Sequence, residues 1–232
     1  MRQVVLDTET TGLEVGKGHR VIEIGCIELL ERRPTQRRFH RYLNPQRAID
    51  EGARAVTGIS DEFLLDKPLF AQIADELLDF IGDAELIIHN AAFDLAFLDA
   101  EFEIAGLPQH SLGGRVAVLD TLALAREKYP GQKNSLDALC RRLEVDNAHR
   151  ELHGALLDAE LLADVYLAMT AGQGDLGLAA AVAYVPIRVT LAATARVALK
   201  VLAASAQELA AHASRLTAID KASKGLCRWR LE

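Results

Sequence analysis

Two carboxylates, Asp7 and Glu9, follow a short apolar run at positions 4–6. The run is Val-Val-Leu, and such apolar, β-branched residues predict a buried strand. Because residues i and i+2 of a strand point to the same face, we expect the two carboxylates side by side at the strand end. Neighbouring anions repel each other and lose hydration on burial, costs that a hard cation such as Mg²⁺ or Mn²⁺ relieves. For this pair alone, the alternative is a solvated strand end or the cap of a following helix.

A third carboxylate, Asp94, comes just after another predicted strand. Residues 85–88 read Glu-Leu-Ile-Ile, which predicts a short buried strand, and a helix is expected over 92–104. Asp94 therefore falls in the first turn of a helix beyond a strand end. This is the edge at which α/β sheets place their sites.

A fourth carboxylate, Asp158, interrupts the apolar face of a helix expected within 149–169. An unpaired carboxylate among leucines is costly, so Asp158 needs a partner. His153 lies five residues earlier, and positions five apart do not share a helix face. We therefore expect His153 in the loop before the helix, with Gly154 as a flexible joint. A lone histidine is more often structural, but the proximity of Asp158 favours a functional pair.

Four carboxylates on three separate elements, with one histidine, suit phosphoryl transfer. Such a set can hold two divalent ions about 3.5–4 Å apart, which stabilise the attacking and leaving oxygens. Histidine, with an unperturbed pKa of about 6.5, can take a proton from water at neutral pH. We expect two Mg²⁺ or Mn²⁺ ions as cofactors. The residues predicted to bind metal and carry out catalysis are Asp7, Glu9, Asp94 and Asp158, with His153 as the base.

The elements that must position these residues alternate between strand and helix patterns. Strands are expected at 3–8, 21–31, 38–43, 85–88 and 116–119. Helices are expected at 50–59, 69–81, 92–104, 121–129, 135–143 and within 149–169. Residues 32–35 (Arg-Arg-Pro-Thr) are expected to form the turn between the second and third strands.

Charge divides the chain into two parts. The 232 residues carry 26 Lys or Arg and 33 Asp or Glu, a net charge of −7. Residues 171–232 have a net charge of +4, so residues 1–170 have a net charge of −11. An acidic main domain disfavours broad duplex binding through a basic face. It allows binding of a short nucleic-acid end through metal ions.

Cysteine usage and hydropathy indicate a soluble, cytoplasmic protein. Three scattered cysteines lack the spacing of a metal site and are expected to be reduced thiols. No secretory signal is visible at the N-terminus. The longest apolar run, 176–187, is too short to span a bilayer, so we expect no membrane association.

Three motifs resemble those of the DEDD exonuclease superfamily, in the same order: Asp7-x-Glu9, His89-Asn90-x-x-Phe93-Asp94 and His153-x-x-x-x-Asp158. A tyrosine four residues before the last Asp would mark another subclass, but that position is Gly154. His153 marks the DEDDh subclass. The resemblance implies an α/β, ribonuclease-H-like fold, with a mixed five-stranded sheet whose second strand is antiparallel and which helices flank.

Within this subclass the chain is similar to the proofreading exonucleases of bacterial DNA polymerase III. The similarity is strongest at 61–68, 88–93, 134–140 and 152–169 and covers nearly the whole chain. It implies that Asp7, Glu9 and Asp158 are direct metal ligands. It also implies that Asp94 binds metal partly through water and that His153 is the general base.

The same resemblance implies which residues contact the terminal nucleotide. Thr10 lies where relatives use a backbone amide near that nucleotide, and Leu13 lies where they place an apolar wedge. Strand-end packing is the alternative for Leu13. Relatives carry a Glu and a His where this chain has Gly52 and Thr57, and Glu51 could substitute for the former. The expected substrate-binding residues are Asp7, Glu9, Thr10, Leu13, Gly52, Thr57 and Asp158.

The chain after residue 170 is expected to be a tether followed by a docking tail. In the tether, 171–204, the sequence at 173–178 resembles the peptide by which polymerase subunits bind the β sliding clamp, through Gln173, Leu176 and Leu178. Ser205 and Glu208 form a capping box that opens a helix to about residue 219. The tail, 205–232, carries the apolar Leu226 and Trp229 and is expected to dock on a partner.

By resemblance, the partner of the tail is the α subunit of DNA polymerase III. The resemblance leaves open a small θ-like subunit on the exonuclease domain, which we expect to span 1–170. The leading function is a metal-dependent 3′→5′ exonuclease that removes mispaired nucleotides from a DNA 3′ end as 5′-monophosphates, within the replisome. A mismatched end supplies single-stranded DNA at a lower unpairing cost.

Two other functions remain open at this point. A DEDDh exoribonuclease would use the same active-site residues, because the 2′-hydroxyl is recognised by surrounding contacts. A structural protein that tethers polymerase to clamp would not need the carboxylates, so the complete acidic set argues against it.

Overall fold

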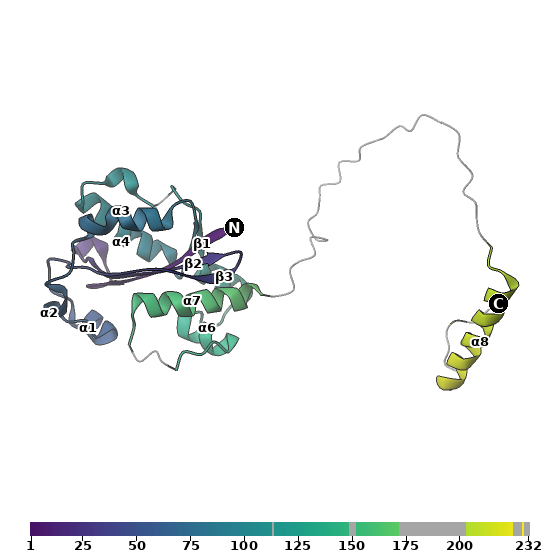
Figure 1. The fold of residues 1–232 in the computed structure, drawn as a ribbon. Helices are drawn as coiled ribbons and strands as arrows, with labels where there is room; N and C mark the ends of the chain where they lie inside the picture. The colour runs from purple at the N-terminus through teal and green to yellow at the C-terminus, as the bar shows by residue number, and fades with distance from the viewer. Residues whose placement is uncertain (113, 149–151, 172–202, 225–228, 230–232) are drawn as a thin grey trace, which may run out of the picture. The chain divides into compact units, whose positions relative to one another are not determined.

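A mixed β-sheet lies between two layers of helices in the first part of the chain (Figure 1). The structure, a computed structural model, describes residues 1–112, 114–148, 152–171, 203–224 and 229. The chain divides into two compact units, Met1–Ala179 and Ala180–Glu232. Each unit is described by itself.

The sheet has the strand order β3-β2-β1-β4-β5. β2 runs antiparallel to both of its neighbours, whereas β4 runs parallel to β1 and β5. This confirms the expected mixed sheet with an antiparallel second strand. The strands are β1 (Arg2–Thr10), β2 (Val21–Leu30), β3 (Arg33–Tyr42), β4 (Glu85–Ile88) and β5 (Val118–Asp120).

Helices cover both faces of the sheet: α3 and α4 lie on one side, and α6 and α7 lie on the other (Figure 1). The helices of the first unit are α1 (Glu51–Thr57), α2 (Asp61–Leu64), α3 (Phe70–Ile81), α4 (Ala91–Ile104), α5 (Thr121–Lys128), α6 (Leu136–Leu143) and α7 (Ala155–Thr170). The described residues of this unit also form two short 3-10 helices, η1 (Val15–Lys17) and η2 (Pro108–His110). The sequence did not indicate α2.

Burial on both faces explains the continuous apolar run in β1. Val4 and Leu6 belong to the core on the α3–α4 side, whereas Val5 belongs to the core on the α7 side. All three side chains are fully buried. A strand covered on one face only would alternate apolar with polar residues, so this run indicates a central strand.

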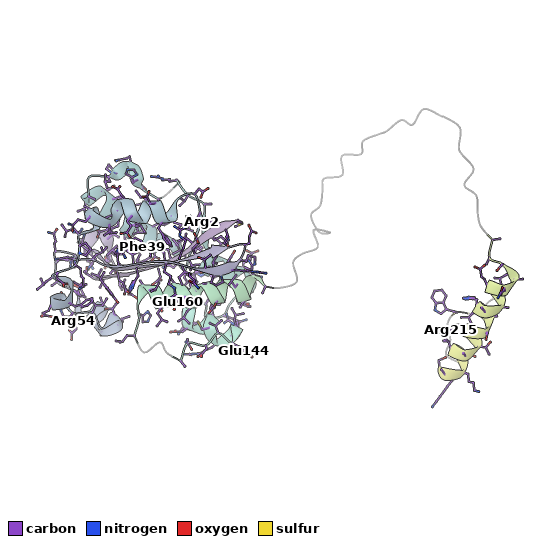
Figure 2. The ribbon with its side chains drawn as sticks, viewed as in Figure 1. Arg2, Phe39, Arg54, Glu144, Glu160 and Arg215 are labelled. Carbon is purple, nitrogen blue, oxygen red and sulfur yellow. The ribbon has the colours of Figure 1, made fainter. Side chains whose placement is uncertain are left out.

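The outer strand β3 shows the same division between the two layers (Figure 2). Phe39 packs against Phe80 of α3, with ring centroids 5.8 Å apart. The preceding Arg38 forms an ion pair with Glu160 of α7. Charged side chains along this edge oppose pairing with another sheet, a common protection of exposed edge strands.

The turn between β2 and β3 differs from the expectation. Glu31 and Arg32 form a two-residue turn with φ values of 49° and 62°. Positive φ at both central residues matches the strand twist in tight hairpins. Pro34, expected in the turn, lies in β3, because an edge strand tolerates a residue without a backbone donor. β5 also begins two residues later than expected, at Val118.

The second unit contains helix α8 (Ala206–Ala222). The Ser205 hydroxyl accepts a hydrogen bond from the Glu208 amide, and the Glu208 carboxylate accepts one from the Ser205 amide. This confirms the predicted capping box. Along α8 no residue is buried, and Trp229 is also exposed. Gln173, Leu176, Leu178 and Leu226, for which contacts were predicted, lie outside the described residues.

Among the residues that the structure describes, none of the helices has both the length and the apolar character needed to cross a membrane.

A glycine in β2 allows the start of α7 to lie directly against the sheet. A Cβ atom at Gly25 would lie 2.3 Å from the carbonyl carbon of Ala155 and 2.3 Å from the amide nitrogen of Leu156. Both contacts are with backbone, which cannot rotate away. Gly25 also pairs with Asp7 across the β1–β2 ladder. A larger residue would therefore separate α7 from the strand that carries the first carboxylates.

We predict that Gly25→Ala destabilises the fold by about 2 kcal/mol or more, the range expected when a close-packed core is overfilled. The free energy of unfolding in urea would measure it. Gly16→Ala is the matched control, because a Cβ there has no neighbour within 4 Å. Equal effects of the two substitutions would show that the α7–β2 approach is not tight.

Candidate active site

One pocket, of about 560 Å³, is lined by all five residues predicted to carry out catalysis. They come from three parts of the fold: the end of β1, the first turn of α4, and α7 with the segment before it. These five residues are Asp7, Glu9, Asp94, His153 and Asp158.

The end of β1 presents carboxylates to one helix layer and a threonine to the other. Asp7 and Glu9 lie on the same face as Val5, which packs on the α7 side. Thr8 points to the opposite side, where it contacts Asp94 of α4. The pairing of β1 with β2 shifts register between Glu9 and Thr10. Such bulges are common beside active sites, where they redirect side chains.

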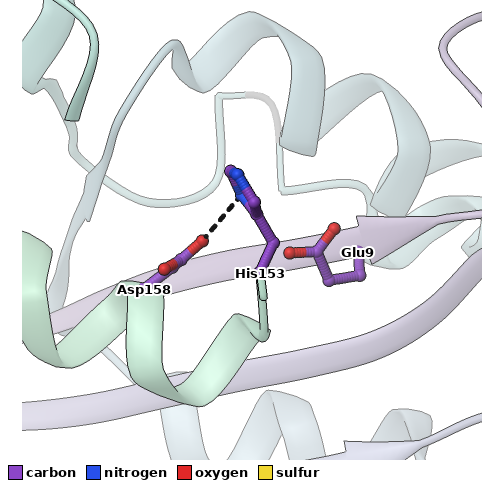
Figure 3. A group of neighbouring side chains, drawn as sticks. All are labelled: Glu9, His153 and Asp158. Atoms are coloured by element: carbon purple, nitrogen blue, oxygen red, sulfur yellow. Dashed lines mark ion pairs between the residues drawn. The ribbon is translucent and has the colours of Figure 1, made fainter. Parts of the chain in front are cut away.

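Glu9, His153 and Asp158 form a close group (Figure 3). One ligand atom from each lies within 4.8 Å of the others. Nδ1 of His153 lies 3.2 Å from Oδ2 of Asp158, which is 4% exposed, whereas His153 is 44% exposed. Carboxylate oxygens are hard donors that suit Mg²⁺ or Mn²⁺, whereas imidazole is a softer ligand, so the carboxylates of this pocket are the better candidates for holding such a cation.

His153 precedes α7, as predicted, rather than belonging to it. Helix α7 begins at Ala155, and Gly154 before it is extended, with φ of −155°. Asp158 falls in the first turn of the helix, where its charge also interacts favourably with the helix dipole. The change from extended chain to helix at Gly154 allows both side chains to face the same pocket.

Asp94 is held by Thr8 and is 3% exposed. Its Oδ1 accepts hydrogen bonds from the Thr8 amide, at 3.1 Å, and from the Thr8 hydroxyl, at 2.7 Å. Burial raises the pKa of Asp94 to about 7, although the bonds from Thr8 oppose this shift. Asn90, in the left-handed region with φ of 67°, turns the chain from β4 into α4 and so directs Asp94 inward.

Asp120, which belongs to none of the three motifs, connects two segments at the far side of the pocket. Its Oδ1 accepts hydrogen bonds from the amides of Asn90, at 3.1 Å, and Leu122, at 2.8 Å. Nδ1 of His89 lies 2.9 Å from the Thr121 hydroxyl, and burial lowers the pKa of this histidine. The signal in the sequence that could have revealed Asp120 is its place in an Asp-Thr pair between an apolar strand and a helix, because Asp is a common N-cap residue.

A further buried carboxylate, Glu23, lies opposite Glu9 on β2. Its Oε1 lies 2.7 Å from Nε2 of His40. Pairing with His40 offsets the cost of burying this charge behind the pocket. Glu23 stands within an almost continuous apolar and buried strand, and no motif in the sequence singles it out.

A second pocket adjoins the first and is lined by the residues expected to contact the terminal nucleotide. Both pockets share Thr8, Glu9 and Phe93. The expected residues in the lining are Thr10, Leu13, Gly52 and Thr57. Leu13 is 81% exposed, so it is not packed at the strand end.

The Thr57 side chain makes hydrogen bonds at the end of its own helix, α1. Its hydroxyl donates to the Ala53 carbonyl at 2.9 Å and accepts from the Ile59 amide at 3.2 Å. Glu51 is exposed and is not among the described residues that line either pocket. The Thr57 hydroxyl is therefore engaged at its own helix end, and Glu51 does not contribute to either pocket lining.

Comparison with known proteins identifies the family to which the domain with this site belongs. The family model described as "Exonuclease", of the RNase T type, matches residues 4–166. These residues contain both pockets and all of the sheet except the first two residues of β1, and they define an exonuclease domain that belongs to a metal-dependent class.

Curated relatives extend the match to nearly the full length. DNA polymerase III subunit epsilon of Salmonella typhimurium is 51% identical over 237 residues, covering 99% of this chain and 97% of that protein. The Escherichia coli epsilon subunit is 49% identical with the same coverage. The chain belongs to the exonuclease family and, within it, to the epsilon subunits of DNA polymerase III.

Solved structures share the fold at lower identity. Exonuclease X in complex with 5′ overhanging duplex DNA is 24% identical, with a TM-score of 0.57, covering 74% of this chain and 93% of that one. The nuclease domain of 3′hExo, a DEDDh family member bound to rAMP, is 18% identical, with a TM-score of 0.60, covering 72% and 90%. These structures support the ribonuclease-H-like sheet and its helices.

We predict that the raised pKa of Asp94 makes the metal-free protein less stable as pH rises. The folded state holds the Asp94 proton up to a pKa of about 7, whereas the unfolded chain releases it near the ordinary value of 3.8. Unfolding therefore releases a proton between these values. The resulting loss is up to about 1.4 kcal/mol per pH unit.

Urea unfolding in the presence of a chelator, from about pH 4 to about pH 7, would measure this loss. Asp94→Asn retains an oxygen for Thr8 but no charge, so it should become more stable than the unaltered protein as pH rises. Asp75→Asn, on the exposed face of α3, is the control. Parallel curves for Asp94→Asn and the unaltered protein would contradict the prediction.

Proposed function

We propose that the four carboxylates and His153 hydrolyse the terminal phosphodiester bond of a DNA strand. The chain is a proofreading 3′→5′ exonuclease of the DNA polymerase III epsilon type. The observation that carries the mechanism is the close group of Glu9, His153 and Asp158 in a pocket that also contains Asp7 and Asp94.

The carboxylates have the role of holding two divalent cations, Mg²⁺ or Mn²⁺. Asp7, Glu9 and Asp158 are the proposed direct ligands, and Asp94, held by Thr8, is proposed to bind partly through water. When bound, such cations lower the pKa of water and stabilise the charge that develops on the phosphoryl oxygens. Until then, the carboxylates repel one another, and Asp94 is easily protonated.

His153 is the proposed general base. Asp158 contacts its Nδ1, which orients the imidazole and leaves Nε2 as the nitrogen that takes the proton from water. An Asp158 carboxylate has two oxygens, so it can contact His153 and a cation together. The partial exposure of His153 allows the proton to pass on to solvent after each cycle.

The second pocket is proposed to receive the 3′-terminal nucleotide. Its lining joins the catalytic pocket through Glu9 and Phe93, so a nucleotide there would bring its 5′ phosphate toward the carboxylates. The exposed Leu13 is proposed to pack against the last bases. Thr10 and Gly52 would offer backbone at the wall of this pocket. Mispaired ends reach it more readily because they unpair at lower cost.

The epsilon relatives favour DNA over RNA as the substrate. Structures bound to RNA ligands are also similar, but at 18% identity or less they support the fold alone. Membership in an enzyme family also excludes the alternative of a non-catalytic tether.

We predict that, with Mg²⁺ or Mn²⁺, the protein releases nucleoside 5′-monophosphates faster from a DNA 3′ end than from an RNA end of matched sequence. Asp7→Ala should abolish release and weaken Mn²⁺ binding. His153→Ala should keep Mn²⁺ binding and lower kcat about 100-fold or more, as expected for a lost general base. Product analysis and calorimetric titration with Mn²⁺ would measure these effects.

The controls are Asp79→Ala and His212→Ala, at exposed positions that are not among the residues lining either pocket. A preference for RNA ends would overturn the proposed substrate. Loss of Mn²⁺ binding in His153→Ala would show that His153 is a metal ligand within its close group with Glu9 and Asp158.

We further propose that the chain works within a polymerase complex in the bacterial cytoplasm, with 1–170 as the exonuclease domain. Residues 205–232 would bind the polymerase α subunit, and Gln173, Leu176 and Leu178 in the tether would bind the β sliding clamp. The exposed apolar side chains Leu209, Ile219 and Trp229 support a docking role for the tail. A θ-like subunit on the exonuclease domain remains part of this proposal.

We predict that deleting 205–232 abolishes binding to the α subunit and leaves nucleotide release from free DNA unchanged. Replacing Gln173 and Leu176 with Ala should weaken clamp binding alone, so each variant serves as the control for the other. Co-purification and surface binding with both partners would measure this. Retained α binding after the deletion would refute the docking tail.

A further inference from the structure

The segment that carries His153 is attached to the end of helix α1. The amide of His153 donates a hydrogen bond to the carbonyl of Val56, at 3.0 Å. This carbonyl belongs to the last turn of α1, where helices leave carbonyl groups without an intrahelical partner. The proposed base is therefore connected to α1 through its own backbone, in addition to its side-chain contact with Asp158.

A second contact joins the same two segments. Gly58 ends α1 with φ of +70°, and a Cβ atom there would lie 2.5 Å from Cδ1 of Leu152. The Leu152 side chain thus lies directly over the glycine. Leu152 is nevertheless 49% exposed, so it contributes to this contact more than to the main core. Together, Val56 and Gly58 form a dock for the residues 152–153.

Helix α1 is also a wall of the second pocket, which we propose to receive the terminal nucleotide. Gly52, Ala53, Val56 and Thr57 line that pocket. Val56 is 45% exposed there, although its carbonyl accepts the bond from His153. One short helix therefore contacts the pocket with its side chains and the base-bearing segment with its last turn.

The rest of α1 is attached firmly to the fold. The amide of Asp50, just before the helix, donates to the Thr11 carbonyl at 3.0 Å. Beyond the helix, Ile59 joins Ile22, Ile49 and Leu64 in a separate small core. Because Val56 lines the second pocket and its carbonyl accepts the bond from the His153 amide, a contact in the pocket can be transmitted to residues 152–153 through the last turn of this anchored helix.

We propose that α1 is a positioning element that places the His153 imidazole according to whether a nucleotide fills the second pocket. The residues that act are Val56, Gly58 and Leu152, none of which is among the residues lining the catalytic pocket. The inference rests on the proposed function, because it takes His153 as the base. A merely structural role of the contact is the competing explanation, and it predicts losses of stability that do not depend on the substrate.

The first test is a double-mutant cycle at the dock. Gly58→Ala should displace Leu152 and lower kcat on single-stranded DNA about tenfold, because small displacements of catalytic groups are costly. Leu152→Ala should lower kcat less. The double variant should equal Leu152→Ala, because the methyl group at position 58 then meets no side chain. KM and Mn²⁺ affinity should remain unchanged throughout.

Gly106→Ala is the matched control for backbone strain. Gly106 has φ of +75°, but a Cβ there has no neighbour within 4 Å. Gly106→Ala should lower the free energy of unfolding by an amount similar to that of Gly58→Ala and leave kcat unaltered. Additive effects of Gly58→Ala and Leu152→Ala on kcat would contradict the proposed role of the dock. So would a loss of kcat in Gly106→Ala as large as that in Gly58→Ala.

The second test uses the substrate to probe the coupling. Each variant is compared on DNA ending in a normal nucleotide and on DNA whose last nucleotide lacks its base. In the unaltered protein the missing base should lower kcat. The ratio of kcat on normal DNA to kcat on DNA that lacks the terminal base should be at least about threefold smaller in Leu152→Ala, because the dock no longer transmits whether the second pocket is filled.

The outcomes separate this inference from the proposed function. An unchanged ratio in Leu152→Ala, with normal activity of the unaltered protein, would refute the coupling and leave the function intact. Failure of the unaltered protein to release nucleotides from either DNA, with Mn²⁺ bound, would refute the proposed function itself.

Discussion

Repulsion between carboxylates brought to one place is the constraint on which this structure depends. Asp7, Glu9, Asp94 and Asp158 line a single pocket, and two of them are almost fully buried. Burial disfavours the charged form, as the raised pKa of Asp94 shows. Such a group is tolerable only when cations can bind and when the surrounding fold is stable enough to hold the side chains in place. The sheet with a helix layer on each face supplies that stability.

Each of the two helix layers contributes one carboxylate to the pocket and faces one side of β1. Asp7 and Glu9 leave β1 on the side of α7, which brings Asp158, while Thr8 leaves on the other side and holds Asp94 of α4. The alternation of a single strand thus joins both layers at the pocket. Gly25 completes the arrangement, because only a residue without a side chain lets α7 begin so close to β2.

The histidine is held differently from the carboxylates. It lies on a short segment before α7, is partly exposed, and contacts both Asp158 and the end of α1. A proton acceptor must exchange its proton with solvent in each cycle, so full burial would impair it. The carboxylates, which hold charge rather than transfer protons, benefit from rigid elements. This difference in burial agrees with the different roles that we propose.

By itself, the sequence determined the strands and helices that carry the site, and it predicted the five residues that the structure brings to one pocket. The apolar run before Asp7, the capping box at Ser205 and the spacing of His153 from Asp158 are local patterns, and local patterns follow from backbone geometry. Only the tertiary structure decided the turn at Glu31 and Arg32, the role of Asp120, the approach of α7 to Gly25, and the attachment of residues 152–153 to α1. These depend on contacts between segments far apart in the chain, which no local pattern contains.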